Sequence, residues 1–135
     1  MKKSGIIALF CALVLGGAFL FLACGTKDGV MTKKNGVYTI DTTTLSQNVK
    51  GYIGPTPLLI TVEKDKVVKI EALENSETPR FFKHMLDGGI LEKWNGLTVD
   101  EALNANVDVV AGATYSSNAV IENVRLGLAY YKEHK

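Results

Sequence analysis

The sequence predicts an α+β fold in which helices pack on an antiparallel sheet, preceded by an N-terminal apolar signal or anchor segment. Two observations predict this fold. Short runs rich in β-branched and aromatic residues lie in the first half of the polar part of the chain, and segments with helical periodicity lie in the second half. Strands followed by helices, without βαβ alternation, are typical of helices packed on an antiparallel sheet.

Three runs are predicted to be strands. The first is Val-Tyr-Thr-Ile at 37–40, and a turn rich in glycine and proline follows at 51–57. The runs at 58–62 and 67–73 are separated by four polar residues, so we expect them to form a β-hairpin. The second of these runs alternates, and its predicted buried face carries Val68, Ile70 and Ala72.

The segment 78–88 is predicted to be a helix. Thr78 is a suitable N-cap, Pro79 fits the first helical position, and Gly88 is a suitable end. The predicted buried stripe consists of Phe81, Phe82, Met85 and Leu86.

Two more helices are predicted further along the chain. Residues 98–101 have the pattern of a capping box at the start of a short helix. The last helix is expected to begin near Ser116 or Ser117, which are its predicted caps. Its buried face is expected to carry Val120, Val124, Leu128 and Tyr131, with Ile121 beside them.

The N-terminus resembles a secretion signal. Two lysines precede an uncharged apolar run of 18 residues at 6–23, and Cys24 follows directly. Phe-Leu-Ala-Cys at 21–24 resembles a bacterial lipobox, which implies cleavage and lipid attachment at Cys24. The alternative is an uncleaved transmembrane anchor, because the run is just long enough to span a bilayer.

Both alternatives place the protein at the extracytoplasmic face of the cell membrane. The expected organisation is a signal or anchor at 1–23, a lipidated cysteine and tether at 24–34, and one domain at 35–135.

Composition excludes several functional classes. The chain has 135 residues and a formal net charge of +1, and the 112 residues after the leader carry a net charge of −1. No strongly basic block remains, so nucleic acid is not an expected partner. The two cysteines, Cys11 in the leader and Cys24 at its end, leave no pair for a disulfide and no catalytic thiol. Motifs for a catalytic triad, a phosphate-binding loop or a dinucleotide fold are not found either.

The most informative segment is 108–118, directly before the last helix. Gly112 and Ala113 leave the backbone open, and Thr114 places a hydroxyl at a helix N-terminus, where free amides favour a phosphate. Glycine and serine also cluster before helices simply as turns and caps. From the residues alone, both interpretations stay open.

Asp-Val-Val-Ala-Gly-Ala-Thr at 108–114 closely resembles the D-x-x-[S/T]-G-A-T flavinylation signature of FMN-binding domains. These domains occur in extracytoplasmic flavin subunits of sodium-pumping NADH:quinone oxidoreductase and Rnf-type complexes, and in small FMN-binding bacterial lipoproteins. The resemblance implies FMN joined through its phosphate to Thr114 by a flavin transferase that uses FAD and magnesium. It makes Asp108, Gly112 and Ala113 recognition and packing positions, and Ala111 stands where the family usually has Ser or Thr.

A second segment, Asn-Ser-Glu-Thr-Pro at 75–79, resembles the E-T-P segment of the same family. The resemblance covers about residues 35–131 and implies that Glu77 and Thr78 face the flavin. The alternative for Glu77 is a solvated acid before a helix. Arg80 stands where many members have glycine, which implies a positive charge near reduced flavin.

Other residues have competing interpretations. Ser116 and Ser117, predicted as caps, are also candidates for contact with the FMN phosphate. Tyr52 is expected either to approach the flavin or to pack on the sheet. Trp94 is predicted to be a core residue rather than a flavin contact, and His84 and His134 are assigned to the surface or to packing.

The function that follows from the resemblance is membrane-tethered electron transfer by FMN. The expected partners are the flavin transferase, membrane redox proteins or quinone-linked electron donors, and the membrane itself. An electron carrier is favoured over a stand-alone enzyme. The alternatives are a surface lipoprotein that binds FMN or another phosphorylated ligand noncovalently, and a small FMN-dependent reductase.

Overall fold

The computed structural model describes residues 29–135. The predicted leader at 1–23 and Cys24 therefore lie outside the described residues. Along the chain the elements are β1 (Met31–Lys34), β2 (Val37–Asp41), β3 (Leu58–Glu63), β4 (Lys66–Ala72), α2 (Pro79–Asp87), the 3-10 helix η1 (Ile90–Trp94), α3 (Val99–Asn104) and α4 (Thr114–His134).

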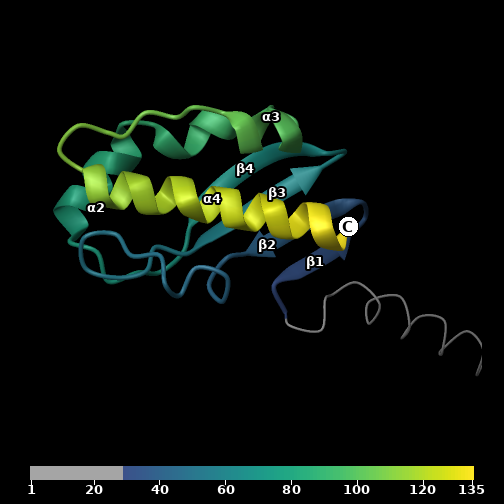
Figure 1. The fold of residues 1–135 in the computed structure, drawn as a ribbon, viewed down its shortest axis with the longest axis horizontal. Coiled ribbons are helices and arrows are strands. Elements are labelled where there is room, and N and C mark those ends of the chain that lie inside the picture. The colour runs from purple at the N-terminus through teal and green to yellow at the C-terminus, as the bar shows by residue number, and fades with distance from the viewer. Residues whose placement is uncertain (1–28) are drawn as a thin grey trace, which may run out of the picture.

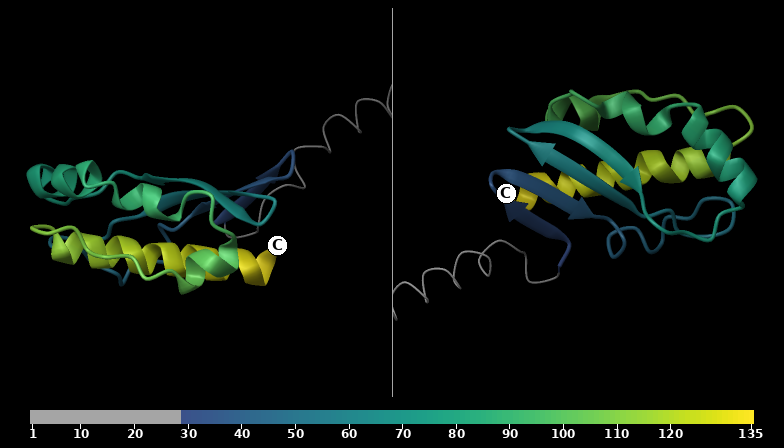
Figure 2. Two further views of the ribbon diagram at one scale, coloured as in Figure 1. Left: turned by 90° about the horizontal axis from the view of Figure 1, so that it is seen from above. Right: turned by 180° about the vertical axis from the view of Figure 1, so that it is seen from behind.

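The four strands form one antiparallel sheet in the order β1-β2-β3-β4, and the long helix α4 lies across one face of it (Figures 1 and 2). This arrangement confirms the predicted α+β class. Within the described residues, no helix is both long enough and apolar enough to cross a membrane.

β1 extends the sheet beyond its predicted limit. Met31 is paired with Ile40 and Lys34 with Val37, so the segment 31–34 is a strand. These residues fall within the predicted tether at 24–34. Their pairing with β2 means that the sheet begins before residue 35.

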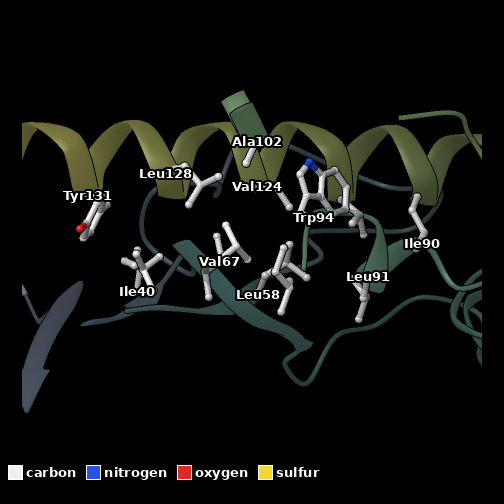
Figure 3. Packing of buried hydrophobic residues seen from close by; sticks show 14 of the residues in the cluster. Ile40, Leu58, Val67, Ile90, Leu91, Trp94, Ala102, Val124, Leu128 and Tyr131 are labelled. Carbon is white, nitrogen blue, oxygen red and sulfur yellow. The ribbon is translucent and has the colours of Figure 1, made fainter. Parts of the chain in front are cut away.

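The core lies between the sheet and α4. Strand alternation points Leu58, Ile60 and Val62 of β3 inward, and all three are fully buried. From α4, the predicted stripe of Val120, Val124, Leu128 and Tyr131 meets them, each at most 2% exposed. Figure 3 shows these two layers with Trp94 of η1 between them. Trp94 is 2% exposed, which confirms its prediction as a core residue.

The prediction that Val68 lies on the buried face of β4 is wrong. Thr61 pairs with Lys69 and Val62 pairs with Val67, so Val68 is left over as a bulge residue. Val67 is therefore buried, whereas Val68 is 45% exposed. Ile70 remains on the buried face, as predicted.

Local helix signals were mostly predicted correctly. Thr78 is the N-cap residue of α2, Pro79 begins that helix, and Gly88 ends it. At α3, the backbone amide of Glu101 donates to the Thr98 hydroxyl at 3.1 Å, and the Thr98 amide donates to the Glu101 carboxylate at 3.0 Å. These two bonds form the predicted capping box.

Two predictions about helix faces and ends are wrong. Phe81 was expected in the buried stripe of α2 but is 47% exposed, while Phe82 and Met85 are buried. The last helix begins at Thr114 rather than near Ser116 or Ser117, and its N-cap residue is Ala113. The two serines are therefore not caps. Both are buried within the first turn of α4.

Candidate functional site

A tight turn places Thr114 at the start of α4. The Ala113 amide donates to the Val110 carbonyl at 3.0 Å, which closes the turn around Ala111 and Gly112. Gly112 has a φ of +84°, a conformation that side-chain-bearing residues rarely adopt. Glycine at this position of the motif is thus required by the turn.

Two side chains hold this turn from outside. The Val110 amide donates to the Ser117 hydroxyl at 3.1 Å. On the other side, His84 of α2 donates from Nε2 to the Ala111 carbonyl at 2.8 Å. The turn is therefore fastened to both α2 and α4, and Ser117 serves the turn instead of capping the helix.

The amides at the start of α4 are available to a ligand. Ala113 supplies no side-chain cap, and the first intrahelical bond at this end runs from the Ser117 amide to the Ala113 carbonyl, at 2.9 Å. The amides of Thr114, Tyr115 and Ser116 precede that bond. They carry the positive end of the dipole of a 21-residue helix.

Thr114 is exposed and opens onto a pocket of about 240 Å³, which we call the Thr114 pocket. Three segments that are distant in sequence form it: the turn at 51–54, helix α2 and the start of α4. Figure 1 shows α2 and the start of α4 at the same end of the molecule. The lining residues are Tyr52, Phe81, Gly112, Ala113, Thr114, Tyr115 and Ser116.

The buried carboxylate of Glu77 lies behind this pocket. It accepts hydrogen bonds from the amides of Tyr52 at 3.0 Å, Ile53 at 2.7 Å and Gly54 at 2.9 Å. The Ser116 hydroxyl donates to the same carboxylate. Glu77 is only 6% exposed, which rules out the alternative of a solvated acid.

Its surroundings keep Glu77 ionised. Burial acts to raise the pKa of the Glu77 carboxyl, but the bonds from the Ser116 hydroxyl and the three amides outweigh burial and hold this pKa below its ordinary value. A carboxylate with four donors can remain charged inside a protein because its lone pairs are satisfied.

The predicted site residues fall into two groups. Gly112, Ala113, Thr114 and Ser116 line the pocket. The other predicted residues lie outside the lining. Asp108 and Ala111 are exposed, Ser117 is buried, and Thr78 is half-buried at the N-cap of α2. Glu77 contacts the lining through its hydrogen bonds to Ser116 and to the turn that carries Tyr52.

Phe81 and Tyr115 are lining residues that the sequence did not indicate. The spacing of Phe81 predicts a core position in a buried stripe, whereas Tyr115 directly follows the motif at 108–114 and its exposure depends on where α4 begins. Tyr52 lines the pocket as well, so the turn aromatic is not packed into the sheet.

Charged residues of α2 lie beside the pocket. Arg80 lines a neighbouring hollow that shares Phe81 and Gly112 with the Thr114 pocket, and its guanidinium carbon is 6.0 Å from the centre of the Phe81 ring.

His84 is exposed, and the ring of His134 stacks on Tyr130 with ring centres 3.8 Å apart, in agreement with the predicted surface and packing roles of the two histidines. Among the described residues, no group of three or more acidic, histidine or cysteine side chains is arranged to hold a metal ion.

Comparison with known families decides which ligand this geometry serves. Residues 51–129 match the model of the FMN-binding domain, and this match covers more than half of the chain. The chain belongs to the FMN-binding domain family. No curated protein is similar enough to this chain to be matched with it.

The FMN-binding domain contains the complete Thr114 pocket, since all its lining residues lie within 51–129. The geometry fits FMN on two counts. Free helix amides suit a phosphate group. Three exposed aromatic side chains suit a planar ring system. The protein is therefore an FMN-binding flavoprotein.

Proposed function

We propose that FMN is attached through its phosphate to Thr114 and that the protein is a membrane-tethered electron carrier on the extracytoplasmic face. The observation that carries the proposal is the place of Thr114. It is an exposed hydroxyl residue at the first position of α4, at the edge of a pocket within an FMN-binding domain. Buried or capping hydroxyls, such as those of Ser117 and Thr98, are already engaged in hydrogen bonds.

Attachment is a phosphoryl transfer in which this chain supplies the acceptor. The Thr114 oxygen attacks the phosphorus on the FMN side of the FAD diphosphate. A Thr–O–P bond forms, the P–O–P bond breaks, AMP leaves and the hydroxyl proton is released. A flavin transferase with magnesium would perform this step, so this chain needs only an accessible hydroxyl on a backbone that a transferase can approach.

The start of α4 is suited to the product. A phosphodiester carries about one negative charge, by analogy with other phosphate esters. The amides of Thr114, Tyr115 and Ser116 and the helix dipole would stabilise that charge. The φ of +84° at Gly112 turns the chain just before this point, and neither Gly112 nor Ala113 carries a bulky side chain that would cover the phosphate.

Bound FMN supplies one- and two-electron chemistry, while the protein orients it and controls access. The Thr114 pocket lies at the surface, where a redox partner can approach. Covalent attachment and a membrane tether would both prevent loss of the cofactor from an exported protein. The tether itself would be lipid at Cys24 or an uncleaved segment at 1–23, both outside the described residues.

Mass spectrometry and gel fluorescence test the attachment. The protein is co-expressed with a flavin transferase, and its intact mass is measured after denaturation. We expect the added mass of FMN and a fluorescent band on a denaturing gel. Thr114→Ala should lose both signals, and Thr114→Ser should retain part of them.

Thr44→Ala is the matched control, because Thr44 is exposed in a turn and does not line the pocket; it should be labelled like the parent. A protein that binds FMN but releases all of it on denaturation would contradict covalent attachment and would support the noncovalent alternative.

Electron transfer requires a separate test. Reduced holoprotein is mixed anaerobically either with membranes from the source cells or with small soluble acceptors, and its reoxidation is followed by absorbance. A carrier should be reoxidised faster by membranes. Steady turnover of a small acceptor, with a chemical reductant supplied in excess and without any partner protein, would contradict the carrier function and favour a reductase.

A further inference from the structure

Three of the large apolar side chains that the structure exposes meet at one place. Tyr52 and Tyr115 are each 66% exposed, and Phe81 is 47% exposed. All three line the Thr114 pocket, although they come from a turn, from α2 and from α4. Apolar side chains that converge around a pocket with polar neighbours are typical of a ligand-binding surface.

The rings of Tyr52 and Tyr115 are neighbours in the lining of the pocket. Their ring centres are 6.0 Å apart and their planes are inclined by 47°. Tyr52 supplies the first of the three amides bound by Glu77, and Tyr115 directly follows Thr114. A planar group joined to Thr114 would therefore meet aromatic faces within a short distance of its point of attachment.

One carboxylate holds both tyrosine-bearing segments. Glu77 accepts from the backbone amide of Tyr52 itself, and it also accepts from the hydroxyl of Ser116, the neighbour of Tyr115. These partners are 25 residues before Glu77 and 39 residues after it. Because the link is charge-assisted and buried, it fixes the two segments relative to each other more firmly than a surface contact would.

The turn also leaves space for this carboxylate. A Cβ at Gly51 would lie 2.7 Å from Glu77 Oε2 and 2.8 Å from Cδ, closer than atoms can pack. The glycine therefore allows the backbone of the turn to approach the Glu77 side chain.

We propose that Tyr52, Phe81 and Tyr115 form the binding surface for the isoalloxazine ring, and that Glu77 is a positioning residue that aligns the two tyrosines. The proposal depends on FMN binding by the domain and, for the place of the ring, on the proposed attachment at Thr114. Glu77 touches the turn and Ser116, so its influence on the flavin passes through Tyr52 and Tyr115.

The ring surface is tested by the optical signature of the bound flavin. Tyr52→Ala, Phe81→Ala and Tyr115→Ala are prepared in flavinylated form, and visible circular dichroism and flavin fluorescence are compared with the parent. Neighbouring tyrosines quench flavin emission by electron transfer, so each tyrosine variant should be several-fold brighter and less dichroic. Phe81→Ala should lose dichroism with a smaller gain in emission.

Tyr130→Ala is the matched control, since Tyr130 lies near the opposite end of α4; its flavin spectra should be those of the parent. Unchanged spectra in all three pocket variants would overturn the ring surface. If the intact mass shows that no covalent FMN is present, the same spectra are recorded with FMN added to saturation. The intact mass thus reports a failure of covalent attachment at Thr114, whereas the flavin spectra report a failure of the proposed ring surface.

Reversible binding provides a second measurement. In a Thr114→Ala background, FMN is titrated into the protein and the dissociation constant is determined. Removing one stacking aromatic should weaken binding by about tenfold. Equal affinities for Tyr52→Ala, Tyr115→Ala and their common parent would contradict the proposal.

The role of Glu77 is tested by coupling between residues. Ser116→Ala removes the link from Glu77 to α4 but leaves the three amides of the turn in place. It should reduce flavin dichroism in the parent, and it should have no further effect on dichroism once Tyr115 is already alanine. It should lower the melting temperature in both backgrounds.

A purely structural role for Glu77 would give the opposite result: Ser116→Ala would then lower stability without changing the flavin signal of the parent. Glu77→Gln should resemble Ser116→Ala and also disturb Tyr52, because an amide nitrogen cannot accept the hydrogen bonds of the turn.

Discussion

Asn123, in the middle of α4, accepts a hydrogen bond from the hydroxyl of Thr42 at 2.9 Å, although the two residues are 81 positions apart. The same hydroxyl accepts from the Leu58 amide at 2.9 Å, so Thr42 connects α4 to the start of β3. Asn123 also donates to Ala119 of its own helix at 2.9 Å and to the Thr56 hydroxyl at 3.3 Å. This buried network holds the middle of α4 against the segments at 42 and 56–58.

Asn123→Ala should lower the free energy of unfolding by about 2 kcal/mol, because it leaves buried hydroxyls without their partner. Urea denaturation measures this change. Asn48→Ala is the control, since Asn48 is exposed, and it should change stability little. Equal stability of Asn123→Ala and the parent would show that the network does not hold α4.

Gly127→Ala should also destabilise the protein. Helix propensity alone favours alanine by about 1 kcal/mol. At this position, however, the added Cβ would lie 2.6 Å from Ile60 Cδ1 and 2.9 Å from Thr42 Cγ2, both on fully buried residues. Overpacking of this kind typically costs about 1–3 kcal/mol, so the net change should be a loss.

Thermal unfolding of Gly127→Ala is compared with that of Asn118→Ala, an exposed position of the same helix. The control gains helix propensity without a clash and should melt at the same temperature as the parent or slightly higher. A Gly127→Ala variant that is more stable than the parent would mean that α4 can move away from the sheet at no cost.

Stability should depend on pH through Glu77. Because its pKa is lower in the folded protein than its ordinary value of 4.5, the unfolded chain binds a proton more readily. The stabilisation by the Glu77 carboxylate is thus complete above about pH 4.5 and is lost as the pH falls through the lower folded pKa.

The melting temperatures of the parent and Glu77→Gln are compared from neutral to acidic pH. The parent should be more stable at neutral pH, and the difference should shrink as the pH falls below 4.5. Asp65, Glu101 and Glu122 also have lowered pKa values. They are present in both proteins, so the difference isolates Glu77. A difference that is constant over the whole range would argue against an ionised Glu77.

Cys24→Ser should change how the protein is held at the membrane. If Cys24 carries lipid, the variant loses the lipid mass and is no longer processed by lipoprotein signal peptidase. The measurement is the intact mass of the membrane fraction, with Cys11→Ser as control. A mass that differs from that of the parent only by the exchange of sulfur for oxygen would contradict lipidation and support an uncleaved anchor at 1–23.

The sequence alone was sufficient for features that depend on near neighbours. The capping box at 98–101, the N-cap at Thr78 and the buried face of α4 follow from contacts within one or two helical turns, and the structure has them. The motif at 108–114 and the segment at 75–79 indicated the correct family, because a motif preserves the local backbone that a shared ligand requires.

Tertiary structure decided the features that depend on distant partners. Pairing of β3 with β4 placed the bulge at Val68 and turned that side chain outward, which alternation within one strand cannot reveal. The orientation of α2 against the start of α4 exposed Phe81 to the pocket. Glu77 became a buried link because its donors come from a turn 23 to 25 residues earlier and from a helix 39 residues later. The sequence therefore determined the residue types at the site, while packing between distant segments determined which of them meet.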